Sequence, residues 1–492
     1  MVLEILQMIM QPHVLLAMFL AMFFGVFVGA MPGLTATMAT ALLIPFTYFM
    51  DPLTGLSMII AMTAVAIFAG DIPSVLLKIP GTPASAAQTI DAYALARKKP
   101  PVEVLNVDLV CSIIGGIIGS LILIFSAPAL AEFAVNFTTV EYFWLALWGL
   151  SMAIVISAEK PIRGVIGVII GFLIATIGID PVYGYVRFTF GSIDLLSGIS
   201  FIPAMIGLFA IPELLRQISR PYERYEVQLL KSKNPYGLVI VSLKKHKIIL
   251  VRSSLIGTFI GALPGAGADI AAWTAYGVEK RVSKKPEEFG KGSLEGIVAS
   301  TAANNAALSG AWIPLLVFGI PGDSITAIVL GALMAHGLRP GPTLFEKHET
   351  LVAALFATFI LANLLMLLVG YIAIKLSSNV LRVPRNVLVP LIFLYCVIGS
   401  YAVNNSLFDV WIMLIFGILG YFMERLRIPI ASVVLAIILG PMVEFNFITS
   451  LIKSDLNPLI FVSRPISIAL ASLALFTWLL PFIRTKKTKK RE

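Results

Sequence analysis

Long apolar stretches separated by short polar segments dominate the pattern along this chain. Each stretch runs for roughly 20 residues, the length that a helix needs to cross the ~30 Å hydrocarbon core of a bilayer. Clear examples are residues 105–131, 140–158, 162–179, 198–215, 351–376, 387–403, 407–423 and 463–483. Together with apolar segments interrupted by proline and glycine, they predict an all-α polytopic membrane protein with roughly 10–12 transmembrane segments.

Two of the interrupted apolar segments occur twice. Residues 25–33 (GVFVGAMPG) match residues 257–265 (GTFIGALPG), with six of nine residues identical. Residues 72–81 (IPSVLLKIPG) match residues 313–322 (IPLLVFGIPG). The two offsets, 232 and 241, are nearly equal, which predicts two homologous halves. Pro-Gly interruptions at corresponding places in two halves are typical of the binding site of a secondary transporter.

Basic residues gather in a few polar segments and predict the topology. The segment 220–247 is interpreted as a basic cytoplasmic linker between an N-terminal transmembrane repeat, 1–219, and a C-terminal repeat, 248–492, with a basic tail. Because Lys and Arg mark cytoplasmic loops, we expect an outside N-terminus and a cytoplasmic C-terminus in the cell (inner) membrane. Basic residues flank only the second Pro-Gly hairpin, 253–279. The two hairpins would then enter the membrane from opposite sides, as inverted repeats with re-entrant or broken helices.

The composition excludes several other classes of protein. Hydrophobic residues make up 58% of the chain and charged residues only 13%, against about a quarter charged residues in soluble domains. The formal charge of +9 is explained by cytoplasmic loops, so nucleic-acid binding is not expected. The histidines and cysteines lack metal-ligand spacing, and no P-loop motif is present. We expect no catalytic residues, no metal site and no cofactor, and transport that does not depend on ATP.

At its repeated segments the chain resembles the large membrane subunit of the tripartite tricarboxylate transporters, the TctA family. The matching stretches are Gly25–Thr47, Lys78–Arg97, Gly257–Tyr276 and Glu295–Pro342. The resemblance implies a secondary transporter, not an enzyme, that imports citrate-like tricarboxylates or other organic acids with an ion gradient. It also implies two partners, a small membrane subunit and an extracytoplasmic solute-binding protein.

A carboxylate ligand needs hydrogen-bond donors, and hydroxyls, amides and half-helix N-termini supply them. We therefore predict that the substrate site lies at the four Pro-Gly breaks and at an Asn pair in an apolar run. The candidate substrate-binding residues are Pro32, Gly33, Thr35, Pro80, Gly81, Thr82, Ser85, Pro264, Gly265, Asn304, Asn305, Pro321, Gly322, Ser324 and Thr326. The alternative is that the small residues only allow close helix packing and that the asparagines make interhelical hydrogen bonds.

Two acidic residues in the second half depart from the pattern that the resemblance implies. Asp269 and Asp323 stand where small neutral or hydroxyl residues are expected, whereas Thr301 replaces a usual glutamate. We predict that Asp269 or Asp323 helps to bind the coupling cation, Na⁺ or H⁺. The alternative is that both aspartates face water at the mouth of a cavity.

Three further ionisable residues lie in or beside apolar segments, where such residues are functional candidates. Asp71 and Lys78 are seven residues apart, so they either neutralise each other or have a role in transport. Asp91 is either functional or a cap beside a basic cluster.

Three other functions would require different features. A stand-alone organic-anion:cation symporter would need no binding protein. An intramembrane aspartyl protease would need a Gly-x-Gly-Asp motif, which Gly265–Asp269 only approximates. A passive channel would show a repeated polar lining, whereas polarity here is concentrated at the breaks.

Overall fold

The structure is a computed structural model that describes residues 2–31, 34–156, 161–219, 232–265, 267–380 and 385–488. Within these ranges the chain is mostly helical, with one two-stranded antiparallel sheet. The expected all-α class is therefore confirmed. The elements are α1 (Val2–Ile9), α2 (Pro12–Ala30), α3 (Ala36–Thr47), α4 (Pro52–Ala69), α5 (Asp71–Leu77), α6 (Ala86–Ala96), α7 (Pro101–Ala134), α8 (Thr139–Ile156), α9 (Pro161–Ala175), β1 (Gly178–Ile179), β2 (Val186–Arg187), α10 (Phe201–Ser219), α11 (Gly237–Lys245), α12 (Lys247–Gly261), α13 (Gly267–Val282), η1 (Pro286–Glu288), α14 (Leu294–Phe318), α15 (Ser324–Ala335), α16 (Pro342–Lys347), α17 (Glu349–Val380), α18 (Arg385–Asn404), α19 (Leu407–Arg425), α20 (Ile430–Lys453), η2 (Pro458–Val462) and α21 (Pro465–Thr488).

Seven helical segments of the described part are long and apolar enough to cross a membrane. They are α2, the continuous segment of α4 and α5, α7, α10, α17, α19 and α20. Shorter apolar helices lie in α3, α9, α15, α18 and α21. The polytopic membrane protein is thus confirmed, whereas the number of crossings and their orientation remain predictions.

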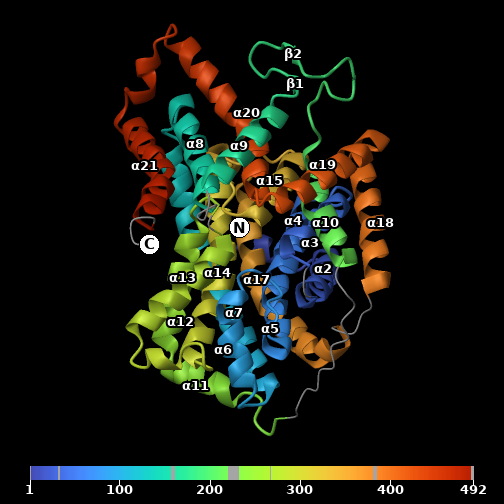
Figure 1. Ribbon diagram of the computed structural model, residues 1–492, viewed down its shortest axis with the longest axis vertical. Helices are drawn as coiled ribbons and strands as arrows, with labels where there is room; N and C mark the ends of the chain where they lie inside the picture. The colour runs from blue at the N-terminus through green and yellow to red at the C-terminus, as the bar shows by residue number, and fades with distance from the viewer. Residues whose placement is uncertain are drawn as a thin grey trace.

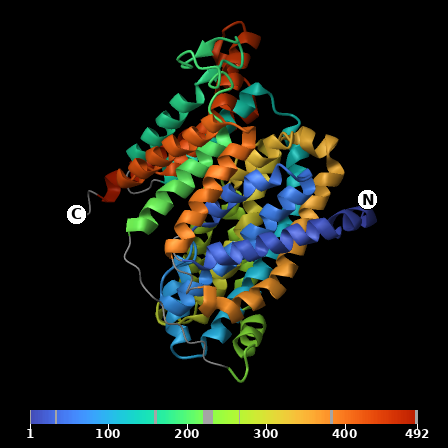
Figure 2. The ribbon, with the colours of Figure 1, turned by 90° about the vertical axis from the view of Figure 1, so that its right-hand side faces the viewer.

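The helices form one body in which the two ends of the chain lie on opposite sides (Figure 2). One group, α8, α9, α20 and α21, packs together at the upper left in Figure 1, and α10 packs with α18 and α19 at the right. The centre is built by α4, α7, α14 and α17, which pack against one another. The central helices therefore carry contacts from both predicted halves.

A β-hairpin begins at the end of one predicted apolar stretch. The sequence predicts apolar residues through position 179, but α9 ends at Ala175 and β1 begins at Gly178. The backbone N–H groups of Val182 and Tyr183 donate to Asp180, at 2.8 and 2.7 Å. These bonds, together with the nearby guanidinium of Arg187, lower the pKa of Asp180.

Close backbone contacts occur at corresponding places in the two halves. A methyl group added to Gly29 would lie 2.3 Å from the carbonyl oxygen of Ala66, so α2 touches α4 there. A methyl group added to Gly261 would lie 2.3 Å from the carbonyl oxygen of Ala307, so α12 touches α14 in the same way. Only glycine allows helices to approach this closely.

The second Pro-Gly break of each predicted half, Pro80-Gly81 or Pro321-Gly322, is called the inner break. The helices before the two inner breaks end in the same manner. Lys78 after α5 and Gly319 after α14 have left-handed backbones, with φ of 61° and 69°. The next N–H in each half, of Ile79 or Ile320, donates to the carbonyl of a proline six residues earlier, at 3.3 and 3.2 Å. This pattern satisfies the free carbonyls at a helix end.

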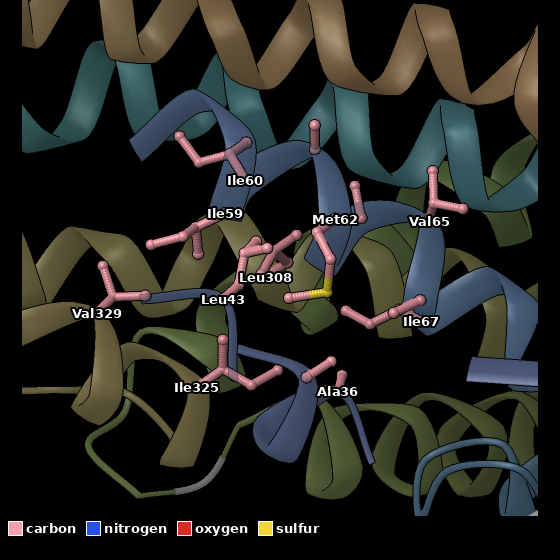
Figure 3. Close-up of a cluster of buried hydrophobic side chains, with 14 of the residues drawn as sticks. Ala36, Leu43, Ile59, Ile60, Met62, Val65, Ile67, Leu308, Ile325 and Val329 are labelled. Atoms are coloured by element: carbon pink, nitrogen blue, oxygen red, sulfur yellow. The ribbon is translucent and has the colours of Figure 1, made fainter. Parts of the chain in front are cut away.

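An apolar cluster joins the two halves. Figure 3 shows Leu43 of α3, Met62 of α4, Leu308 of α14 and Ile325 of α15 meeting in the interior. All four side chains are buried. Ala36, the first residue of α3, and Ile325, near the start of α15, belong to the same cluster. The N-terminal ends of the two helices therefore lie close together, and they line the candidate site.

Candidate functional site

A cavity of about 510 Å³ lies where helix starts from both halves of the chain meet. Its residues come from the start of α3, the segment before α6, the start of α13, the middle of α14, the start of α15, the end of α10 and the α19–α20 connection. The predicted candidates that line it are Thr35, Thr82, Gly265, Asp269, Asn304, Asp323 and Ser324. The fold thus brings residues from all four break segments, and one member of the Asn pair, Asn304, to one place.

The other candidates have different positions. Pro80, Gly81, Ser85, Pro264, Asn305, Pro321, Gly322 and Thr326 belong to the same breaks and helices but do not line the cavity. Pro32 and Gly33 lie outside the described residues. A methyl group added to Gly81 or Gly322 would lie 2.6 Å from a backbone oxygen. These two glycines therefore serve close packing, the alternative left open by the sequence.

Helix N-termini direct partial positive charge toward the cavity. The first residues of α3, α13, α15 and α20 line it, and so do Thr82 and Ala84 just before α6. Free N–H groups and the helix dipole make such ends favourable for anions. Several helix N-termini around one cavity provide backbone N–H groups that can bind an anion, beside the acidic side chains of the same lining.

The carboxylate of Asp323 caps α15. It accepts the backbone N–H of Thr326 at 2.8 Å and the Thr326 hydroxyl at 2.6 Å, while that hydroxyl oxygen also accepts the Asp323 N–H at 2.9 Å. This reciprocal capping box satisfies free donors at the helix start. It also explains why Thr326 is fully buried and turned away from the cavity.

Asp269, at the start of α13, lies close to Asp323. Each carboxylate is within electrostatic range of the other. Gly267, with φ of 59°, allows this approach, because a methyl group there would lie 2.8 Å from Asp323 Cβ. Asp269 is exposed toward the cavity. Among the described residues neither carboxylate forms an ion pair, so the cavity holds two adjacent negative groups.

The first inner break has a neutral version of this cap. Thr82 Oγ1 lies 2.7 Å from Ser85 Oγ and accepts the Ser85 backbone N–H at 3.2 Å. Thr82 lines the cavity, whereas Ser85 is buried behind it.

The two asparagines of α14 have different surroundings. Asn304 lines the cavity, and its buried Oδ1 accepts no hydrogen bond within the described part of the chain. Asn305 instead donates from Nδ2 to the Ser112 carbonyl on α7, at 3.2 Å. One amide therefore faces the cavity while the other holds two helices together.

Four ionisable residues at the cavity were not predicted as site residues. They are Glu213 and Arg216 of α10, Glu424 of α19 and Arg427 after it. Arg216 pairs with both glutamates, whereas no ion pair of Arg427 occurs among the described residues. Arg427 has a left-handed backbone, with φ of 56°.

The proposed neutralisation of Asp71 by Lys78 is wrong. Lys78 is exposed, with Nζ 5.9 Å from the centre of the Tyr93 ring, whereas Asp71 is 1% exposed. Asp91 accepts the backbone N–H of Gly292 at 2.7 Å, which supports the capping alternative for this residue.

Comparison with known proteins agrees with this architecture. The model of the family described as "Tripartite tricarboxylate transporter TctA family" matches residues 15–435. The chain belongs to the TctA family. It is therefore a multi-pass membrane transporter. The match covers every element that lines the cavity, from α3 to the start of α20.

Two relatives come from Agrobacterium vitis. An uncharacterized 52.8 kDa protein in the TAR-I ttuC' 3' region is 33% identical over 462 residues, which cover 93% of this chain and 92% of the relative. An uncharacterized protein in the TAR-II ttuC' 3' region is 37% identical over 234 residues, or 47% of this chain and 97% of the relative. No solved structure matches the chain.

Proposed function

We propose that this TctA family transporter is the permease subunit of a tripartite importer that takes up carboxylates with a cation gradient. A small membrane subunit and an extracytoplasmic solute-binding protein complete the system. The substrates are citrate-like tricarboxylates or other organic acids, and the coupling cation is Na⁺ or H⁺. The observation that carries the proposal is the cavity on which the helix starts of both halves converge.

The donors at the cavity suit an anionic ligand. The Arg427 guanidinium supplies a planar set of N–H groups that fits a carboxylate. The Asn304 amide and the Ser324 hydroxyl add neutral donors, and the N-termini of α13 and α20 add backbone N–H groups. These donors attract a carboxylate most strongly in a site shielded from solvent, because electrostatic attraction is stronger at a low dielectric constant than in water.

The charge balance of the cavity favours a cation that travels with the substrate. Its lining includes four carboxylates, Asp269, Asp323, Glu213 and Glu424, against the two guanidinium groups of Arg216 and Arg427. A carboxylate substrate next to Asp269 and Asp323 would be repelled without a positive charge between them. We propose that this pair helps to hold the coupling cation.

Uptake into proteoliposomes tests the proposal. The chain is reconstituted with a small membrane subunit and a binding protein from the same genome, and [¹⁴C]citrate and [¹⁴C]-labelled dicarboxylates are offered as probes. Accumulation that requires an inward Na⁺ or H⁺ gradient is expected. Uptake without the binding protein would favour the stand-alone symporter. Equilibration without any accumulation would contradict secondary active transport.

A further inference from the structure

A second group of polar side chains lies behind the cavity, between α5, α7 and α14. Asp71 and Asp108 are buried, with exposed fractions of 1% and 0%. Their carboxylates lie close enough to interact electrostatically. Among the described residues no basic side chain pairs with either one. Two adjacent buried carboxylates without a positive partner are unfavourable in a low-dielectric interior.

Hydrogen-bond donors are too few for the acceptors in this group. The single hydroxyl hydrogen of Thr301 faces two acceptors, Gln88 Oε1 at 2.5 Å and Asp108 Oδ1 at 3.3 Å. Ser85 and Gln88 face the Asp71 carboxylate. Even so, neither Asp71 oxygen accepts a hydrogen bond of good geometry from the described residues.

Further oxygens around the two carboxylates lack partners within the described part of the chain. Asp108 Oδ2, Ser112 Oγ and Asn305 Oδ1 are buried and form no hydrogen bond there. The buried donors of the group that lack a partner there are Gln88 Nε2 and the Ser112 hydroxyl, which can also accept. Ser112 lies one helical turn after Asp108 on α7, and Asn305 is bonded to the Ser112 carbonyl. An excess of buried oxygen acceptors over donors is the environment that a hard cation prefers.

We propose that Asp71 and Asp108, with the oxygens of Thr301, Ser112 and Asn305, form a binding site for one Na⁺ ion, separate from the cavity pair Asp269 and Asp323. One Na⁺ and one proton together neutralise the two carboxylates. Gln88 orients the site through its contacts with Asp71 and Thr301. The site deepens the proposed function, because it rests on the coupling of transport to a cation.

The position of this site gives it a route to the substrate. Thr82 lines the cavity, contacts Ser85 at 2.7 Å, and Ser85 faces Asp71. Asn304, which also lines the cavity, precedes Asn305 on α14. Occupation by Na⁺ would draw oxygens of α5, α7 and α14 together, and both inner-break segments are attached to these helices. Cation binding is thereby linked to the shape of the cavity.

Direct binding of ²²Na⁺ to the purified full chain in detergent, without any substrate, tests the site. The wild type is expected to bind Na⁺ saturably and to gain thermal stability in NaCl relative to choline chloride. Asp71→Asn and Asp108→Asn are expected to weaken Na⁺ binding at least tenfold. Asp455→Asn is the matched control, because Asp455 is exposed and its φ of 50° suits asparagine.

A second variant guards against loss of folding. Ser112→Ala removes one oxygen that bonds to nothing in the described residues and is expected to weaken Na⁺ binding several-fold while the protein keeps its elution volume and helical circular dichroism. Wild-type Na⁺ affinity in folded Asp71→Asn and Asp108→Asn proteins would overturn the site, and so would a wild type that binds no Na⁺. If citrate uptake then persists with a proton gradient, the proposed function survives and this site alone fails.

Discussion

The two inner breaks, residues 73–85 and 314–326, have the same backbone conformation but different capping side chains. In each, a left-handed residue ends the helix, and a glycine then packs against the backbone of the preceding hairpin. A threonine caps the next segment in the first half and an aspartate does so in the second, both through the N–H three residues later. The same turn therefore carries a neutral group on one side of the cavity and a charged group on the other.

The equivalent contacts support the proposal that the halves are repeats. The glycines that touch backbone oxygens, and the oxygens that they touch, correspond through the two sequence offsets in both halves. Some of the differences lie in side chains that face the cavity or the buried carboxylates. Asp71, for example, corresponds through the second offset to the fully buried Trp312. We infer that packing maintained the shared frame while the two halves diverged in polar function.

The largest effect is expected from filling the glycine contacts of both breaks. A methyl group at Gly81 would lie 2.8 Å from the Gly29 carbonyl oxygen, and one at Gly322 would lie 2.6 Å from the Gly261 carbonyl oxygen. Because backbone atoms cannot move aside easily, Gly81→Ala and Gly322→Ala should each destabilise the protein by at least about 3 kcal/mol. The measurements are the folded yield and the unfolding temperature in detergent.

The control for these variants is Gly277→Ala in α13, where a methyl group would meet nothing within 4 Å. It should unfold at the wild-type temperature or slightly above, since alanine favours helix. A large loss for one break and none for the other would contradict the shared frame.

A large functional effect is expected at Asn304. It corresponds through the second offset to Thr63, whose hydroxyl is occupied by the Ile59 carbonyl at 2.8 Å. Asn304→Ala should reduce uptake of the labelled carboxylate about 10- to 150-fold, because a charge-assisted hydrogen bond contributes roughly 1.5–3 kcal/mol. Thr63→Ala should leave uptake within about twofold. Unchanged uptake in Asn304→Ala would give this amide a structural role only.

The charge at the second break should control the cation dependence of uptake. Asn caps a helix about as well as Asp does, so Asp323→Asn removes the charge and keeps the fold. The Na⁺ or H⁺ concentration for half-maximal uptake should rise about tenfold, which corresponds to about 1.4 kcal/mol. Thr82→Ser, which keeps the hydroxyl at the first break, should show wild-type dependence. The same dependence in both variants would argue against a cation at the Asp269–Asp323 pair.

The sequence predicted the helices and the breaks well, because both leave local marks. Apolar runs of membrane length and Pro-Gly pairs are visible without knowledge of the fold. Which of two neighbouring residues faces the cavity was not predictable, because that depends on the rotation of α14 against its neighbours. Asn304 and Asn305 differ by about 100° around the helix, and only packing decides which one meets the cavity.

Residues that distant elements bring to the cavity are not marked by any motif in the sequence around them. Arg427 lies in a short connection between α19 and α20, far along the chain from every Pro-Gly break. An exposed arginine beside a helix end reads as a topology signal. Its place at the cavity follows from the packing of α10 against α19 and of α15 against α20. Long-range packing, rather than residue type, made it a candidate.

The smallest expected effects concern the left-handed residues that end α5 and α14. Gly319 has φ of 69°, and a methyl group there would make only an ordinary contact, 3.7 Å from Pro340 Cβ. Gly319→Ala should therefore lower the free energy of unfolding by about 1 kcal/mol. The left-handed backbone is unfavourable for alanine, and the reduced conformational entropy of the unfolded chain offsets part of that penalty. Lys78, with φ of 61°, bears that penalty already, so Lys78→Gly should stabilise the protein by less than about 1 kcal/mol. Unfolding temperatures in detergent would show the two shifts, and shifts of the same sign would mean that these turns are not equivalent.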